Sequence, residues 1–231
     1  MKMKIFIATA ILCSSKAVAQ QGDTAKNLNE VVVTANKFPN KTSLTGKVLT
    51  IISREQIEQA GANSLTQLLS EQAGLYVNGA NSNPAKDKSI YLRGAKVDHT
   101  LITIDGVPVY DPSGIGSNFD ARLLSLDNIE RIEILKGSQS TLYGSDAIAG
   151  VINIITRRAE NKPYAVSGML SYGNYNSFRG NAAISGKSNQ LDYSLNYSYN
   201  KSGGMNEATD TITAPHQTDK DGFTEHNISA A

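Results

Sequence analysis

The sequence contains no tryptophan, and its only cysteine, Cys13, lies near the N-terminus. A single cysteine excludes an internal disulfide framework and a thiolate metal site. An excess of charge of one sign is also missing, because 22 Lys and Arg residues are balanced by 21 Asp and Glu residues among the 231 residues of the chain. Proteins that bind nucleic acid need a basic surface, so we predict no nucleic-acid partner.

Catalytic motifs are missing as well. The chain has no Gly-x-Ser-x-Gly, no His-Glu-x-x-His and no Walker loop, and its three histidines (His99, His216 and His226) are scattered. The short glycine pattern at residues 114–116 lacks the third glycine and the strand–helix context of a dinucleotide-binding loop. These absences argue against an enzyme.

No stretch is long and apolar enough to cross a bilayer as a helix, which takes about 20 residues. Residues 1–19 instead match a signal peptide, with Lys2 and Lys4 before a short apolar run and a small-x-small cleavage site at residues 17–19. A lipoprotein signal at Cys13 is disfavoured, because the leucine before it is too large for the usual lipidation site. We therefore predict export, and any part that spans a membrane must consist of strands.

Residues 20–46 form a polar, flexible N-terminal segment with one β-branched stretch. That stretch favours an extended backbone and consists of Glu30, Val31, Val32, Val33, Thr34 and Ala35. It is either an ordinary buried strand or an exposed strand that pairs with the sheet edge of a partner. Its position between a polar tail and Pro39 fits a core poorly and favours the second interpretation.

Residues 47–160 alternate strand and helix patterns and predict a compact α+β domain, which is large enough to bury its own core. A capping-box pattern at residues 53–56 begins a helix that ends near Gly61, and a second at residues 64–67 begins a helix that Gly74 ends. Strands are expected at residues 48–52, 75–77, 89–92, 101–104, 129–135 and 150–156.

Two long polar loops interrupt this domain, at residues 78–88 and 110–120. Loops of this length are uncommon in a compact domain unless they have a function. We therefore treat both as candidate binding segments.

Residues 161–231 change to a period of two, held over three segments of about ten residues with turns expected at 173–174 and 187–189. One face is apolar or aromatic and carries Tyr164, Val166, Leu170, Tyr172, Phe178, Ile184, Leu191, Tyr193, Leu195, Tyr197 and Tyr199. The other face is polar and includes Arg179, Asn181 and Asp192. A soluble β-sandwich would show the same alternation. The charged inner face, the tyrosines at strand ends and the strand length favour a membrane barrel.

Several motifs in register resemble those of the TonB-dependent outer-membrane receptors. The resemblance covers nearly the whole chain after residue 19 and is carried by residues 30–35, 90–94, 104–108, 129–137, 142–144 and 147–156. Small departures occur at Ser138, where the family often has proline, and at Ala149, where it often has glycine. Both residues are small, so the turn should survive.

The resemblance implies a fold and a mechanism. The expected fold is an α+β plug domain followed by the first antiparallel strands of a transmembrane β-barrel in the outer-membrane lipids of a Gram-negative bacterium. Residues 30–35 would be the TonB box, which pairs with the energy-transducing protein TonB as an added strand. Ligand binding outside and traction by TonB inside would then import a scarce small molecule.

Family plugs bind ligand with two apical loops, which correspond here to the two long loops. The candidate contacts are Asn78, Asn81, Asn83, Pro112, Ser113, Ser117, Asn118 and Phe119. Contact with the barrel wall alone is the simpler alternative. Arg93, Arg131 and Glu133 are expected to form ion pairs with structural or gating roles.

Within the family, residues 143–148 and 217–223 are similar to those of cobalamin receptors, in which the second segment is a calcium-binding turn. Asn206, Asp219 and Asp221 would then be Ca²⁺ ligands, since hard oxygen donors suit that ion, and Asp210 is a further candidate. A solvated acidic turn without metal is the alternative. We predict cobalamin or another corrinoid as ligand, with a ferric siderophore or haem as the alternative.

Other classes with a similar architecture fit less well. A signalling transducer would carry a folded domain before residue 30, and a passive porin would lack the plug. We also expect the chain to be a fragment that transports nothing alone, because open strand edges in lipid leave costly unpaired backbone groups.

Overall fold

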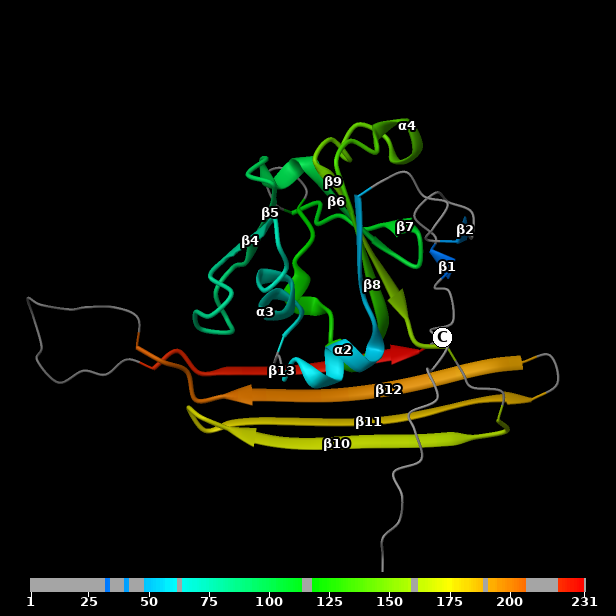
Figure 1. Cartoon of the computed structure of the whole chain (residues 1–231). Coiled ribbons are helices and arrows are strands. Elements are labelled where there is room, and N and C mark those ends of the chain that lie inside the picture. The colour runs from blue at the N-terminus through cyan, green and yellow to red at the C-terminus, as the bar shows by residue number, and fades with distance from the viewer. Residues whose placement is uncertain are drawn as a thin grey trace, which may run out of the picture. The chain divides into compact units, whose positions relative to one another are not determined.

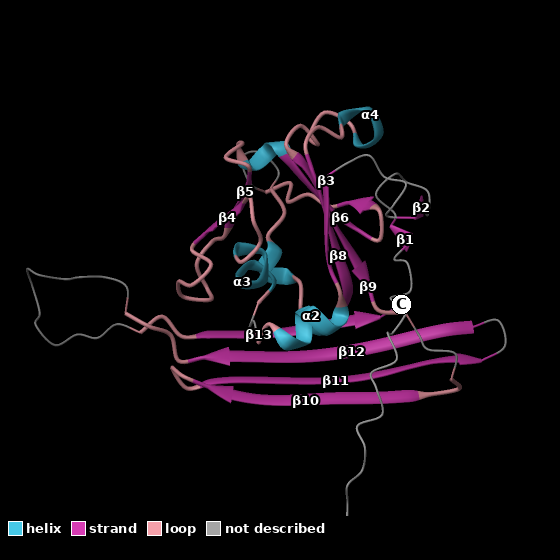
Figure 2. Cartoon of the chain, in the orientation of Figure 1, coloured by secondary structure: helices cyan, strands magenta, loops and turns pink. Residues whose placement is uncertain are grey.

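The computed structural model describes residues 32–33, 40–41, 48–61, 64–113, 118–158, 162–188, 191–206 and 220–230. The predicted signal peptide, residues 1–19, lies outside them. Residues 32–231 form one compact unit, and two sheets make up most of its described part (Figures 1 and 2). The domain bounds drawn from the sequence stay predictions.

A five-stranded mixed sheet forms the centre of the α+β domain. Its strands are β3 (Val48–Ile52), β6 (Thr100–Ile104), β7 (Val107–Pro108), β8 (Ile129–Lys136) and β9 (Gly150–Thr156), in the order β3-β8-β9-β6-β7. Strands β6 and β9 run parallel and the other pairs antiparallel. The β-branched content of these segments explains their extended backbone, and the expected strands at 48–52 and 150–156 are confirmed.

Two short helices pack beside this sheet. Helix α2 (Arg54–Gln59) begins at Ser53 with a complete capping box, because the Ser53 side chain accepts from the Gln56 amide while the Gln56 side chain accepts from the Ser53 amide. Helix α3 (Leu65–Ser70) begins at Ser64, whose side chain accepts from the Gln67 amide. Both expected helix starts are confirmed.

The main core lies between the helices and one face of the sheet. Apolar side chains of α3, such as Leu68 and Leu69, pack there with Ile132 and Ile152, and all four are nearly inaccessible to solvent. Large residues buried in this way are the main favourable term in folding. The core therefore fixes the base from which both long loops project.

The remaining elements of this domain are short. A hairpin of β4 (Leu75–Asn78) and β5 (Ser89–Leu92) carries the first long loop. Three 3₁₀ turns, η2 (Val97–His99), η3 (Ala121–Leu123) and η4 (Leu126–Asn128), and one helical turn, α4 (Ser140–Tyr143), connect the strands. Strands β1 (Val32–Val33) and β2 (Asn40–Lys41) pair antiparallel with each other.

Four long antiparallel strands form the second sheet, in the order β10-β11-β12-β13. They are β10 (Ala165–Gly173), β11 (Ser177–Ser188), β12 (Leu191–Ser202) and β13 (Phe223–Ala230). One row of cross-strand partners is wholly apolar and consists of Val166, Ile184 and Leu195. The face with Val166, Leu170 and Tyr172 is strongly exposed, at 74%, 78% and 73%.

Both predicted turns are wrong in part. Gly173 was expected in the first turn, but it is the last residue of β10 and pairs with Ser177. Lys187 and Ser188 were expected to lie in a turn, but they are the last residues of β11 and pair with Asp192 and Leu191. An ion pair of 3.3 Å between Lys187 and Asp192 supports the longer strand. The hairpin therefore turns within fewer residues than expected.

The predicted fold class, an α+β domain followed by antiparallel strands of the barrel type, is confirmed by this architecture and by the comparisons given below. Within the described residues, no helix combines the length and the apolar character needed to cross a membrane.

Candidate functional site

The first long loop, residues 79–88, is closed by its own lysine. The ammonium group of Lys88 donates to the Gly79 carbonyl, to Ser82 Oγ at 2.6 Å and to the Asn83 carbonyl at 2.9 Å. Three oxygen acceptors match the three N–H donors of an ammonium group. The loop therefore has a defined shape, although much of it is exposed.

The second long loop, residues 109–120, is held by carboxylates near its two ends. Asp111 accepts from the Ser113 amide at 2.8 Å and from its hydroxyl at 2.5 Å. Asp120 caps η3 by accepting from the Arg122 amide at 3.0 Å. Burial alone would raise the pKa of Asp120, but the hydrogen bonds and the charge of Arg122 outweigh it and hold that pKa below 3.8.

Arg122 connects the two loops. Its guanidinium donates to both carboxylate oxygens of Asp120, at 2.9 and 2.6 Å. It also donates to the Ala85 carbonyl and, at 2.7 Å, to Asp87 of the first loop. One side chain therefore contacts segments that lie more than 30 residues apart.

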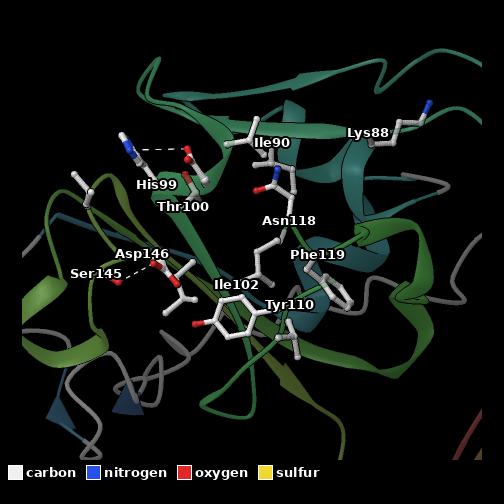
Figure 3. Close-up of a pocket in the computed structure, with 15 residues that line it drawn as sticks. Lys88, Ile90, His99, Thr100, Ile102, Tyr110, Asn118, Phe119, Ser145 and Asp146 are labelled. Carbon is white, nitrogen blue, oxygen red and sulfur yellow. Dashed lines mark hydrogen bonds and ion pairs between the residues drawn. The ribbon is translucent and has the colours of Figure 1, made fainter. Parts of the chain in front are cut away.

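A first cavity of about 450 Å³ opens beside the second loop (Figure 3). Ile90, Ile102 and Phe119 supply apolar surface, while Asn118 and Tyr110 add polar groups. Burial, and then the nearby Asp146 carboxylate, raise the pKa of the Tyr110 hydroxyl. A mixed lining of this kind is typical of small-molecule sites.

A second cavity of about 590 Å³ lies between the first loop and the four-stranded sheet. The loop contributes Asn81 and Ser82, and the sheet contributes Tyr175 and Phe178 near the β10–β11 turn. Lys88 lines both cavities. The two cavities are thus neighbours that share one loop residue.

Three contacts fasten the loop region to the four-stranded sheet. Asn83 Nδ2 donates to the Asp221 carbonyl at 2.9 Å, just before β13. Arg179 of β11 forms an ion pair of 2.9 Å with Asp127 of η4. Asn227 of β13 donates to the Leu123 carbonyl at 2.8 Å.

The predicted ligand residues fall into distinct places. Asn81, which is exposed, lines the second cavity, and the half-buried Asn118 and Phe119 line the first. Asn83 is only 1% exposed and holds the loop to the sheet. Three others sit on exposed surface away from the cavity linings: Asn78, Pro112 and Ser113. Ser117 lies outside the described residues.

The predicted TonB box is described only in part. Val32 and Val33 form β1, whose backbone pairs with Lys41 and Asn40. Glu30, Val31, Thr34 and Ala35 lie outside the described residues. One edge of the two described residues, Val32 and Val33, is therefore already paired within the chain.

One predicted calcium ligand, Asp219, and the further candidate Asp210 lie in the segment 207–219, which is outside the described residues. Asn206 and Asp221 are described and exposed. Within the described part of the chain, no three His, Cys, Asp or Glu side chains gather closely enough to hold a metal.

The expected ion pair of Arg131 and Glu133 is confirmed, at 2.8 Å. The Glu133 side chain is fully buried. It belongs to a polar row across the sheet, because Asn153 donates to it at 3.4 Å and accepts from Thr103 at 2.7 Å. For Arg93 no ion pair is found among the described residues.

Sequence reasoning missed Arg122. Its partner Asp120 lies two residues away, but Ala85 and Asp87 are remote in sequence, so no local pattern reveals the joint. The only available signal was a charged residue directly after a predicted binding loop.

Comparison with known proteins identifies the domain. A family model of the TonB-dependent receptor plug domain matches residues 41–151. The vitamin B12 transporter BtuB of Vibrio cholerae serotype O1 is 36% identical over 146 residues, which make up 63% of this chain and 23% of that protein.

Solved structures share the fold. The ferric enterobactin receptor PfeA of Pseudomonas aeruginosa matches with a TM-score of 0.61 and 24% identity, over 79% of this chain and 30% of that one. The ferric-catecholate import receptor Fiu of E. coli K12 matches with a TM-score of 0.57 and 26% identity, over 75% of this chain and 24% of that one. The chain thus spans less than a third of the length of these relatives. Together, the family match over residues 41–151, the relative at 36% identity and the shared fold show that this chain contains a TonB-dependent receptor plug domain.

Proposed function

We propose that this chain is part of an outer-membrane receptor that imports a corrinoid, with cobalamin as the first candidate. The proposal is supported by the 36% identity to a protein named as a vitamin B12 transporter. The relatives that match are named transporters and receptors, which agrees with the absence of catalytic motifs from the sequence.

The observation that carries the proposal is the meeting of the two predicted ligand loops around neighbouring cavities. Asn81 of the first loop and Asn118 of the second each line one cavity. Phe119 adds apolar surface to the cavity of Asn118, and Phe178 does so in the cavity of Asn81. A corrinoid has a broad apolar ring edged by amides. Amide side chains next to apolar surface can hydrogen-bond such a rim and cover such a ring.

A ferric siderophore is the second candidate, because several of the structural relatives are named ferric enterobactin receptors. An anionic iron complex would need cationic side chains directed at it. Lys88 and Arg122 line the second cavity. Lys88 is held by three oxygens of its own loop, and Arg122 is paired with two carboxylates. This arrangement favours the neutral rim of a corrinoid.

Equilibrium dialysis of the full chain in detergent with cyanocobalamin and with ferric enterobactin tests the choice. We expect cyanocobalamin to bind and ferric enterobactin not to bind. Asn81→Ala and Asn118→Ala should each weaken binding roughly five- to tenfold, as expected for one hydrogen bond of about 1 kcal/mol or slightly more. Ser138→Ala, at an exposed position outside both cavities, is the control. Binding of the siderophore alone would reject the corrinoid.

The proposed energy-transducing partner is TonB, paired with residues 30–35 through backbone hydrogen bonds. Strand β1 pairs with β2 along one edge, and an added strand would pair along the other edge of β1. Proline removes a backbone donor. In the full-length receptor that contains this chain, Val32→Pro should therefore abolish energised uptake while ligand binding stays intact. Normal uptake by this variant would refute the assignment.

Calcium at Asn206, Asp219 and Asp221 is also a proposal. The two sides of the 207–219 segment meet closely, because a Cβ on Gly204 would collide with the Asp221 backbone. This brings Asp221 back beside the residues around Asn206, as a shared oxygen site requires. Calorimetry with CaCl₂ should show binding that Asp219→Asn and Asp221→Asn each abolish. If the heats of CaCl₂ addition are the same in both variants as in the wild type, the segment is a solvated acidic turn without bound calcium.

A further inference from the structure

Arg122 is the side chain that contacts both candidate ligand loops. On one side it forms a forked pair with the Asp120 carboxylate, with distances of 2.9 and 2.6 Å. On the other side it donates to the Ala85 carbonyl and to Asp87 Oδ1 at 2.7 Å. One guanidinium therefore contacts residues of both loops.

We propose that Arg122 is a positioning residue that joins the two ligand loops into one unit, so that the order of each loop depends on the other. Only the description of the loops as ligand-binding rests on the proposed function. The joint itself can be measured in the free protein.

The chemistry of the joint requires arginine. A guanidinium presents five N–H donors in a rigid planar fork, so it can hold a carboxylate on one edge and reach a carbonyl with another donor. An ammonium group is a point charge and cannot span both sides in a fixed orientation. The Arg122 side chain is 24% exposed, which leaves the fork partly shielded from water.

The contacts of Arg122 are unequal. Asp87 is 94% exposed, and ion pairs at such positions add little. Asp120 is 23% exposed and contacts the guanidinium through two oxygens. The contacts that hold the two loops together are therefore those of Arg122 with the Ala85 carbonyl, which accepts a hydrogen bond, and with the Asp120 carboxylate, which orients the guanidinium.

The role of Asp120 in orienting Arg122 distinguishes a joint between the loops from a local cap of η3. Asp120 belongs to the second loop, and the hydrogen bonds that its carboxylate accepts all come from Arg122. If Arg122 joins the loops, loss of the Asp120 charge must loosen residues 79–88, which Asp120 does not contact. A purely local cap of η3 would loosen only the residues around 120–123.

Hydrogen–deuterium exchange of the full chain in detergent, without ligand, tests the joint. Asp120→Asn should speed exchange of peptides from residues 79–88 roughly tenfold or more, the loss expected for one charge-assisted hydrogen bond. Arg122→Gln should do the same, and Arg122→Lys should restore only part of the protection. Asp111→Asn is the matched control, because this carboxylate holds the same loop through Ser113 alone. It should leave residues 79–88 unchanged.

Unchanged exchange of residues 79–88 in Asp120→Asn would overturn the proposal, as would an equal effect of Asp111→Asn. Full protection in Arg122→Lys would overturn the role of the fork. A separate arm adds cyanocobalamin: wild type should gain protection in both loops, and Arg122→Gln in fewer peptides. If cyanocobalamin does not bind the wild type, the proposed ligand is rejected. The exchange measured without ligand then still decides whether Arg122 joins the loops.

Discussion

At the scale of the residue, Gly150 is a position where any side chain would be damaging. Its φ is +154°, and an added Cβ would lie 2.5 Å from Leu92 Cδ2 and closer still to the Leu135 carbonyl oxygen. The residue pairs with both Thr100 and Lys136 at the start of β9. Neither the backbone nor the close packing leaves room for adjustment.

We predict that Gly150→Ala lowers the free energy of unfolding by about 2–4 kcal/mol, through backbone strain and overpacking. Urea unfolding followed by circular dichroism measures this change. Gly173→Ala is the control, since its Cβ would meet no atom within 4 Å. It should change stability by less than about 0.5 kcal/mol. Equal effects of the two substitutions would contradict the close approach at Gly150.

A second prediction concerns the buried carboxylate of Glu133. Arg131→Met removes its ion-pair partner at 2.8 Å and leaves a fully buried charge less well compensated. We expect a loss of about 3–5 kcal/mol in the same unfolding assay. Glu133→Gln together with Arg131→Met should recover part of the loss, because no charge then stays buried. A double variant as unstable as Arg131→Met would show that the charge is not the cause.

At the scale of the element, the joint between the loops should depend on pH. The folded pKa of Asp120 is held below its ordinary 3.8, so its pairing stabilises the protein above that pH. The stabilisation is lost as pH falls through the folded pKa. The difference in thermal midpoint between wild type and Asp120→Asn should therefore be largest near neutral pH and shrink below about pH 4. A difference that stays constant down to pH 2 would contradict the charge-based account.

Elements with strong local signals could be predicted from the sequence. The strand at 89–92 and the capped start of α2 agree with the structure because alternation and capping are local properties. The 3₁₀ turns η2, η3 and η4 were not predicted, since such short turns depend on the strands that they connect. The strand end at Ser188 was misjudged because cross-strand pairing with Leu191 extends it.

The site could be predicted less completely. Loop length pointed to Asn81, Asn118 and Phe119, which do line cavities. It could not distinguish them from Asn83, which is buried against Asp221, 138 residues away. Contacts between such distant segments follow from packing of the whole fold, and single residues carry no trace of them.

At the scale of the whole molecule, the ion pair of Asp127 and Arg179 links the plug domain to the four-stranded sheet. Both side chains are largely buried, at 10% and 14% exposure. Asp127→Asn should lower the free energy of unfolding by about 2 kcal/mol, as expected for a charge-assisted hydrogen bond. Glu58→Gln removes a 59% exposed carboxylate that pairs with Arg54 and should cost less than about 0.5 kcal/mol. If the two substitutions lower the free energy of unfolding equally in urea, the buried ion pair adds no stability.

The central claim is that residues 79–88 and 109–120 together bind a corrinoid. Hydroxyl-radical footprinting of the full chain with saturating cyanocobalamin tests it most directly. Protection should appear in both loops, at Pro84 of the first and Phe119 of the second, and not at the exposed Tyr76 of β4, which lines neither cavity. Binding that protects neither loop, or protection by ferric enterobactin in place of cyanocobalamin, would contradict the claim.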